Sequence, residues 1–172
     1  MKEGEIEFTT IKPGAPGSPY GADAIYSKVI IGGNLPEPGV GGIAESVDRH
    51  NADRTDTALI LTDALGYLAY YQRLDEDLAV RFNQTVNAVA NTAAHELGHI
   101  LGLQHATEVN TATPANIMGY NYEVDLAEQE FRERNSFLDF AEQRGYFEMQ
   151  PGFANEIDML LRAIGSGTAM GW

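Results

Sequence analysis

The chain has 172 residues, of which 44% are hydrophobic, so it is long enough for one domain with a sizeable core and too short for two comfortable ones. Its formal net charge of -14 excludes the electrostatic attraction by which proteins bind nucleic acid or anionic membranes. It contains no cysteine, which excludes disulfides, thiolate metal ligands and thiol nucleophiles.

Membrane-spanning segments are not expected either. No uninterrupted apolar run approaches the roughly 20 residues that a membrane-spanning helix needs. The first ten residues, MKEGEIEFTT, lack the apolar core of a signal peptide. We therefore expect a soluble chain without a nucleic-acid or membrane partner.

Segments of β character come first along the chain. They alternate polar and apolar residues, or form short apolar runs between turn residues such as Gly and Pro. These segments are Glu5–Ile11, Ala24–Gly33, Ile43–Val47 and Thr57–Asp63. The last of them, TALILTD, is apolar enough to be a fully buried strand. The pattern predicts a sheet of about four strands.

The hydrophobic period becomes helical after residue 63. ALGYLAYYQRL (Ala64–Leu74) is predicted to be a short helix. A longer helix is predicted to begin between Leu78 and Thr85 and to end at Gly102, since apolar residues recur along one stripe up to that glycine. The stripe consists of Val86, Val89, Ala90, Ala93, Leu97, Ile100 and Leu101. Strands followed by helices indicate an α+β fold.

The C-terminal part is predicted to be helical as well. Phe137–Gly165 has helical stretches that are broken at Pro151 and Gly152. Its apolar stripe is interpreted as core and consists of Ile157, Leu160, Leu161 and Ile164. We treat residues 1–172 as one domain, with the sheet and the long helix in residues 1–105 and the helical remainder in residues 106–172.

The stretch HELGHILGLQH, residues 95–105, contains three of the four histidines. His95 and His99 are four residues apart, so on a helix both project from one face and can reach one ion. Gly102 permits a positive φ and a sharp turn, which would bring His105 back as a third ligand. Glu96, one step round the helix, suits a carboxylate that contacts a metal-bound water rather than the metal. Three imidazoles without a thiolate leave the fourth tetrahedral position open, as in a catalytic zinc site.

Chance is a weak explanation for this stretch. A lone histidine on a helix is more often a core or surface residue than a metal ligand. The five fixed positions of HExxHxxGxxH, however, would coincide by accident in a chain of this length only roughly once in 10⁵ trials. The pattern therefore favours a zinc site.

The zinc-site pattern resembles the extended signature of the metzincin metallopeptidases at His95, Glu96, His99, Gly102 and His105. That family has a methionine in a tight turn below the zinc, and the resemblance assigns this Met-turn to Met118 in NIMGY. Tyr120 resembles the tyrosine that follows this methionine in astacins and serralysins, whereas matrixins usually lack it. Ala106 matches none of the best-known subfamilies, so the resemblance extends to the family and not to one subfamily.

The resemblance also implies a mixed, twisted sheet, whose antiparallel edge strand binds an extended polypeptide substrate as an added strand. The segment GGIAESV, residues 41–47, corresponds to this edge strand. The substrate-binding residues that it implies are Ile43, Ala44, Glu45, Ser46 and Val47. The family begins with a further strand and a long helix, which this chain does not provide before Glu5–Ile11. Three explanations stay open: the chain is a trimmed form, it is a naturally short version, or its C-terminal helices cover that face of the sheet. A face left bare would be an apolar patch that an additional domain or partner would cover.

The resemblance implies that the chain is a secreted zinc endopeptidase, which hydrolyses peptide bonds in proteins. One zinc ion on the three histidines would lower the pKa of its water to about 7. Glu96 would act as general base, and Tyr120 would donate a hydrogen bond to the developing oxyanion. Two alternatives stay open: a truncated or inactive relative that binds zinc and peptide without cleavage, and a module in which zinc only stabilises the fold. Zinc amidases and aminopeptidases are the runner-up among enzymes.

The loop DRHNADRTD, residues 48–56, gathers the oxygen ligands Asp48, Asn51, Asp53 and Asp56. Metzincins often carry calcium near such loops, so a structural calcium ion is a second cofactor that the resemblance implies. The loop does not match an EF-hand, because Leu59 stands where the bidentate glutamate would be. A solvated polar loop is the alternative.

Overall fold

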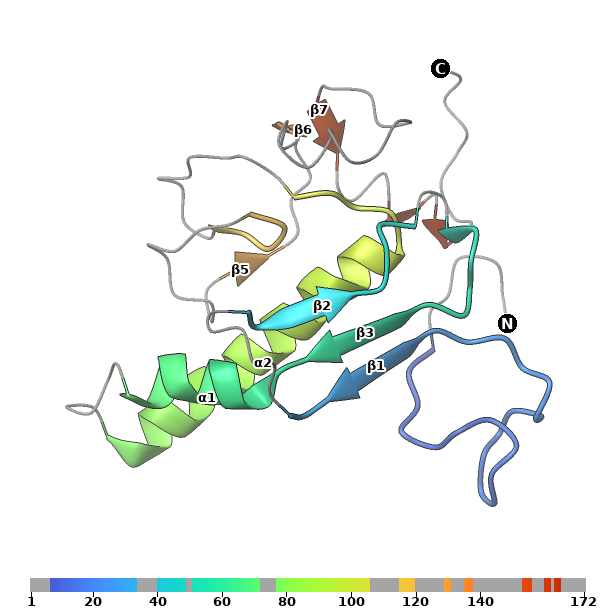
Figure 1. Cartoon of the computed structure of the whole chain (residues 1–172), viewed down its shortest axis with the longest axis horizontal. Coiled ribbons are helices and arrows are strands. Elements are labelled where there is room, and N and C mark those ends of the chain that lie inside the picture. The colour runs from blue at the N-terminus through green and yellow to red at the C-terminus, as the bar shows by residue number, and fades with distance from the viewer. Residues whose placement is uncertain are drawn as a thin grey trace.

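The computed structural model describes residues 7–33, 40–48, 51–71, 77–105, 115–119, 129–130, 135–137, 153–155, 160–161 and 163–164. Within these ranges the fold is α+β, as the sequence predicts (Figure 1). The first five elements are β1 (Lys28–Ile31), β2 (Gly42–Ala44), β3 (Thr57–Ile60), α1 (Thr62–Tyr71) and α2 (Leu78–Ile100). The short strands that follow are β4 (Ala115–Asn116), β5 (Gln129–Glu130), β6 (Asn135–Phe137) and β7 (Phe153–Asn155).

The main sheet has the strand order β1-β3-β2. β1 runs parallel to β3, and β2 runs antiparallel to β3 at the sheet edge, as the edge-strand prediction requires. Three of the four predicted strands are therefore present, in shortened form. The predicted strand Glu5–Ile11 is wrong where the structure describes it, because residues 7–11 form no strand. The Thr9 hydroxyl accepts the Ile11 N–H at 3.0 Å, and this local bond takes a donor that a sheet would need.

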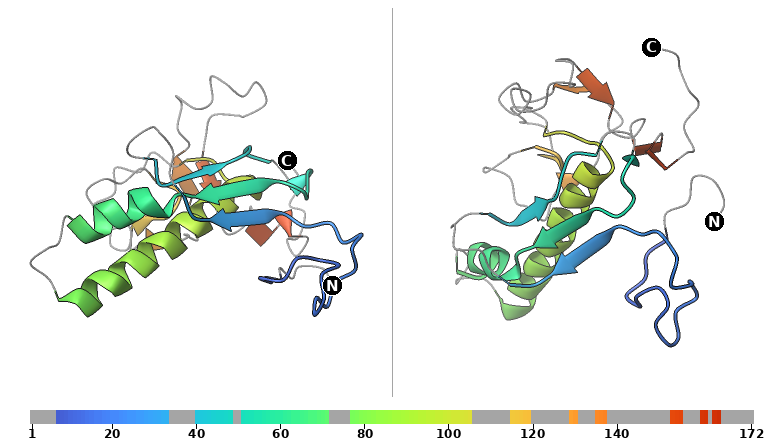
Figure 2. Two further views of the ribbon diagram at one scale, coloured as in Figure 1. Left: turned by 60° about the horizontal axis from the view of Figure 1, so that its bottom comes forward. Right: turned by 45° about the vertical axis from the view of Figure 1, so that its right-hand side comes forward.

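The two faces of the sheet differ in what covers them. α2 crosses one face, behind β2 and β3 in Figure 1 and below them in the left view of Figure 2. Ala58 and Ile60 of β3 are fully buried on that side. On the opposite face the strand register places Ile30, Leu59 and Ile43 side by side, and Ile30 is 50% exposed and Ile43 41% exposed. Neither described helix covers this apolar row, and the predicted covering partner stays a prediction.

Both ends of α2 have local causes. Asp77 caps its N-terminus, because the side chain accepts the Ala79 N–H at 2.8 Å, which fixes the start at the early end of the predicted range. At the C-terminus the N–H of Gly102 bonds to the carbonyl of His99, and the N–H of Leu103 bonds to that of Gly98, each at 2.8 Å. Gly102 has a φ of 96°. This is a Schellman motif, and it reverses the chain directly after the helix.

The prediction of helices in the C-terminal part is wrong for much of the segment that the structure describes. β6 pairs antiparallel with β7, with Phe137 opposite Phe153, across the region where helices were predicted. A short apolar run is compatible with the hydrophobic period of a helix and with that of a strand. Pairing with a distant segment therefore decides which of the two forms. Helical geometry is found at Leu160, Leu161 and Ala163. Leu160 packs on the core as predicted, whereas Leu161 is 40% exposed.

Membrane-crossing potential was also assessed for the helices. Within the described ranges, no helix is both long enough and apolar enough to cross a bilayer.

Candidate metal centre

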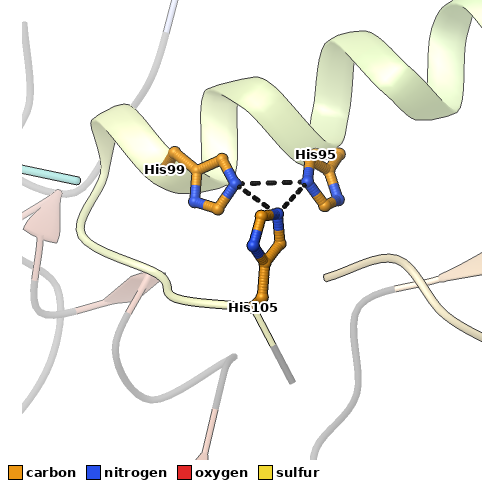
Figure 3. Close-up of side chains that lie close together, drawn as sticks. All are labelled: His95, His99 and His105. Carbon is orange, nitrogen blue, oxygen red and sulfur yellow. Dashed lines mark hydrogen bonds between the residues drawn. The ribbon is translucent and has the colours of Figure 1, made fainter. Parts of the chain in front are cut away.

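The three histidines of residues 95–105 converge on one point (Figure 3). His95 and His99 project from the last turns of α2, and His105 approaches from the segment that follows the Gly102 turn. The Nε2 atoms of His95 and His105 are 2.9 Å apart, those of His99 and His105 3.0 Å, and those of His95 and His99 3.2 Å. The predicted ligand set is thus brought together as the spacing requires.

Two backbone carbonyls fix the orientation of the helical imidazoles. Nδ1 of His95 lies 2.5 Å from the carbonyl of Ile117, and Nδ1 of His99 lies 2.8 Å from that of Leu103. A carbonyl only accepts, so in each ring Nδ1 carries the proton and donates it. Nε2 of each neutral ring then presents a lone pair toward the centre of the triangle.

This arrangement fits a zinc ion. The Nε2 lone pairs of His95 and His99, which lie 3.2 Å apart, repel each other unless a proton or a cation lies between them, because both rings carry their own proton on Nδ1. Zn–N bonds of 2.0–2.1 Å at tetrahedral angles place ligand nitrogens roughly 3.3 Å apart, close to the separations found. Within the described part of the chain, these histidines are the one group of three or more His, Cys, Asp or Glu side chains that lies close enough for a shared ion.

The acidic loop does not form a second group of this kind among the described residues. Asp48 accepts the N–H of Asp53, and Asp53 accepts the N–H and hydroxyl of Thr55, so these carboxylates serve the loop's own backbone. Asp56 is buried, and desolvation followed by the charges of Asp48, Asp53 and Glu45 raises its pKa. The structure thus supplies no described ligand group for the predicted calcium ion.

Glu96 connects the helix to the edge strand. Its side chain is 5% exposed and accepts a hydrogen bond from the N–H of Ala44 in β2. The pairing of Gly41 and Glu45 with β3 leaves the backbone groups of Gly42 and Ala44 at the outer edge of the sheet, so Glu96 lies along that edge. Burial raises the pKa of Glu96 to about 7, and the Ala44 N–H partly opposes this rise.

The raised pKa predicts how the stability of the metal-free chain depends on pH. Glu96 titrates near 4.5 when unfolded and near 7 when folded, so the folded chain binds more protons between these values. Stability should therefore fall as the pH rises from about 4.5 to 7, by roughly 3 kcal/mol from this group. Urea unfolding of the metal-free chain and of Glu96→Gln across this range measures the effect. Parallel stability profiles for the two chains would contradict it.

Gly42 allows the close approach of β2 to Glu96. An ideal Cβ at Gly42 would lie 2.6 Å from Oε1 of Glu96 and 2.9 Å from Cγ2 of Thr92. Any side chain at this position would therefore displace the carboxylate or the strand. The sequence analysis missed this residue, although the pair Gly41-Gly42 directly before an expected strand indicates close backbone approach.

The remaining predicted site residues have mixed outcomes. Met118 is fully buried in a cluster with Leu103 and Ile117, next to the histidines that Ile117 and Leu103 hold. Tyr120 lies outside the described residues. Of the predicted substrate strand, Ile43 and Ala44 belong to β2, while Glu45, Ser46 and Val47 continue beyond it.

Known proteins were compared with the chain at the levels of family, sequence and structure. No family model, curated protein or solved structure matches it.

Proposed function

We propose that this chain is a zinc-dependent endopeptidase that hydrolyses peptide bonds in proteins, with a metzincin-like site. The observation that carries the proposal is the triangle of Nε2 atoms, together with the buried carboxyl of Glu96 on the same helix, next in sequence to His95. The ligand set consists of His95, His99 and His105. Three neutral imidazoles leave a coordination position for a reacting molecule, which distinguishes a catalytic zinc site from a closed structural one.

The chemistry divides between the metal and the protein. When bound, zinc supplies Lewis acidity that polarises the substrate carbonyl and lowers the pKa of water to about 7. Glu96 accepts the proton of the attacking water and returns it to the leaving amine when the C–N bond breaks. Burial raises the pKa of Glu96 in the metal-free chain, and a bound cation would favour the ionised carboxylate that accepts a proton from water.

Substrate orientation is assigned to the edge strand. The outer edge of β2 borders no other described strand, and the carboxyl of Glu96 lies along it. An extended polypeptide that pairs with this edge would place its scissile bond near both the base and the metal. The resemblance adds two further parts to the proposal: Tyr120 as a hydrogen-bond donor to the oxyanion, and secretion of the protein.

The proposal is tested by incubating an unstructured protein with the zinc-loaded chain and with the chain stripped by a chelator. Mass spectrometry of the products should show cuts at internal bonds that depend on zinc. Removal of terminal residues alone would indicate an aminopeptidase. Zinc binding without any product would contradict the enzyme and favour a peptide-binding module, and unfolding on chelation would indicate a structural zinc.

Replacing Gly42 with alanine should lower kcat strongly. The new methyl group would displace Glu96, and a displacement of about 1 Å in a catalytic group costs roughly 10²-fold in rate. Gly41→Ala is the matched control, because no atom of Glu96 is among the nearest neighbours of its ideal Cβ, whose shortest contact is with Cδ2 at the end of the Leu65 side chain, at 3.0 Å. Steady-state kinetics with equal zinc content measures both variants. Equal kcat values for the two variants would show that the approach of β2 to Glu96 is unimportant for the reaction.

A further inference from the structure

Gly98 lies inside α2, between Glu96 and His99, at a position where glycine is costly. Glycine is the poorest helix former after proline. Gly98 is not among the described glycines with positive φ, so no backbone conformation there requires it. Its presence therefore calls for a reason in the surroundings of the helix.

The surroundings show that a side chain at this position has no room. An ideal Cβ at Gly98 would lie 2.6 Å from Sδ and 3.3 Å from Cε of Met118, and 3.3 Å from Cδ1 of Leu103. A thioether on a surface would rotate away. Met118, however, is 0% exposed and Leu103 1% exposed, and both belong to one packed cluster with Ile117. The space that a side chain would take is thus filled by Met118 and Leu103.

These same two segments orient the metal ligands. Leu103 supplies the carbonyl that accepts from Nδ1 of His99, and its own N–H bonds to the carbonyl of Gly98 at 2.8 Å. Ile117, which precedes Met118, supplies the carbonyl that accepts from Nδ1 of His95. A shift of Met118 and Leu103 away from the helix would therefore move both carbonyls that hold the imidazoles.

We propose that Gly98 is a positioning residue of the metal site: its missing side chain lets Met118 and Leu103 pack against α2, and this packing holds the two carbonyls that orient His95 and His99. The inference rests on the proposed zinc site but not on peptidase activity. Loss of a contact that orients a ligand typically weakens metal binding about 10–100-fold. Gly98→Ala should weaken zinc binding by this factor, although alanine favours the helix.

The test is a competition titration of Zn²⁺ against a chromophoric chelator, with the full metal-free chain and its variants. Gly66→Ala is the matched control, because Gly66 also lies in a helix and, among the described residues, no atom outside the local backbone of that helix lies within 4 Å of its ideal Cβ. Its zinc affinity should equal that of the unchanged chain. The visible spectrum of the Co²⁺-loaded chain provides a second readout, since its bands report the geometry of the imidazole ligands and should shift in Gly98→Ala alone.

Removing the clashing side chain separates this effect from a general loss of structure. In Gly98→Ala with Met118→Ala, Sδ and Cε of Met118 are gone and only Cδ1 of Leu103, at 3.3 Å, still meets the new methyl, so adding the glycine change to Met118→Ala should cost little further affinity. If Gly98→Ala does not fold, this double variant decides the question. Equal zinc affinity of Gly98→Ala and the unchanged chain, or full additivity of the two changes, would overturn the inference. If the unchanged chain binds no Zn²⁺, the proposed function fails as well.

Discussion

Replacement of Glu96 with glutamine is expected to lower kcat for peptide-bond hydrolysis by about 10²–10⁴-fold, the usual contribution of a general base. Glutamine keeps the size of the side chain and an oxygen that can accept the Ala44 N–H, but it cannot take a proton from water. The zinc content should be unchanged, because the group of ligand atoms that can share an ion contains the three histidines and not Glu96. Initial rates on an unstructured protein, at matched zinc loading, measure the difference.

The control for this variant removes one negative charge elsewhere. Asp23→Asn changes the net charge equally at an exposed position in the N-terminal loop, and its rate should match that of the unchanged chain. A Glu96→Gln variant that still cleaves within a few-fold of the unchanged rate would contradict the assignment of Glu96 as base. If it loses zinc together with activity, Glu96 supports the metal site instead.

Replacement of His99 with alanine is expected to remove tight zinc binding. His99 is 6% exposed, its ring is held by the Leu103 carbonyl, and it supplies one corner of the Nε2 triangle. The loss should exceed the about 10–100-fold that follows the removal of a contact that only orients a ligand. Competition titration gives the affinity, and activity should disappear with it.

Asn87→Ala is the matched control for the His99 variant, because Asn87 is an exposed residue on the same helix. Its zinc affinity should not change. Far-UV circular dichroism of the metal-free chains shows whether α2 persists in both variants. Retention of tight zinc binding by His99→Ala, with α2 intact, would contradict the three-histidine site.

The parts of the fold that were predicted correctly depend on neighbours in sequence. The helix that carries the stripe up to Leu101 and the turn at Gly102 are each specified within a few residues, whereas the cap at Asp77 was not predicted. The convergence of His95, His99 and His105 follows from that local geometry. The antiparallel edge position of β2 agrees with what the resemblance implied, whereas β3 was predicted to be fully buried and instead alternates half-buried and buried residues.

The parts that were missed depend on contacts between distant segments. The carbonyl of Ile117 meets His95 across 22 residues, and no property of isoleucine indicates this role. Phe137 and Phe153 pair as strands although their surroundings have a helical pattern. Gly42 and Gly98 had visible signals in the sequence, but what each glycine accommodates is known only when the opposing segment is in place.

The turn at Gly102 has a consequence for how the site assembles during folding. The three ligands lie within eleven residues, and the helix and the turn that join them form from local contacts. Closing so short a loop costs little conformational entropy. The imidazoles can therefore be near one another before the sheet is complete, whereas the Ile117 carbonyl reaches His95 only when a longer loop has closed. We therefore expect the three imidazoles to approach one another early in folding, and their final orientation to be reached late, when the distant segments are in place.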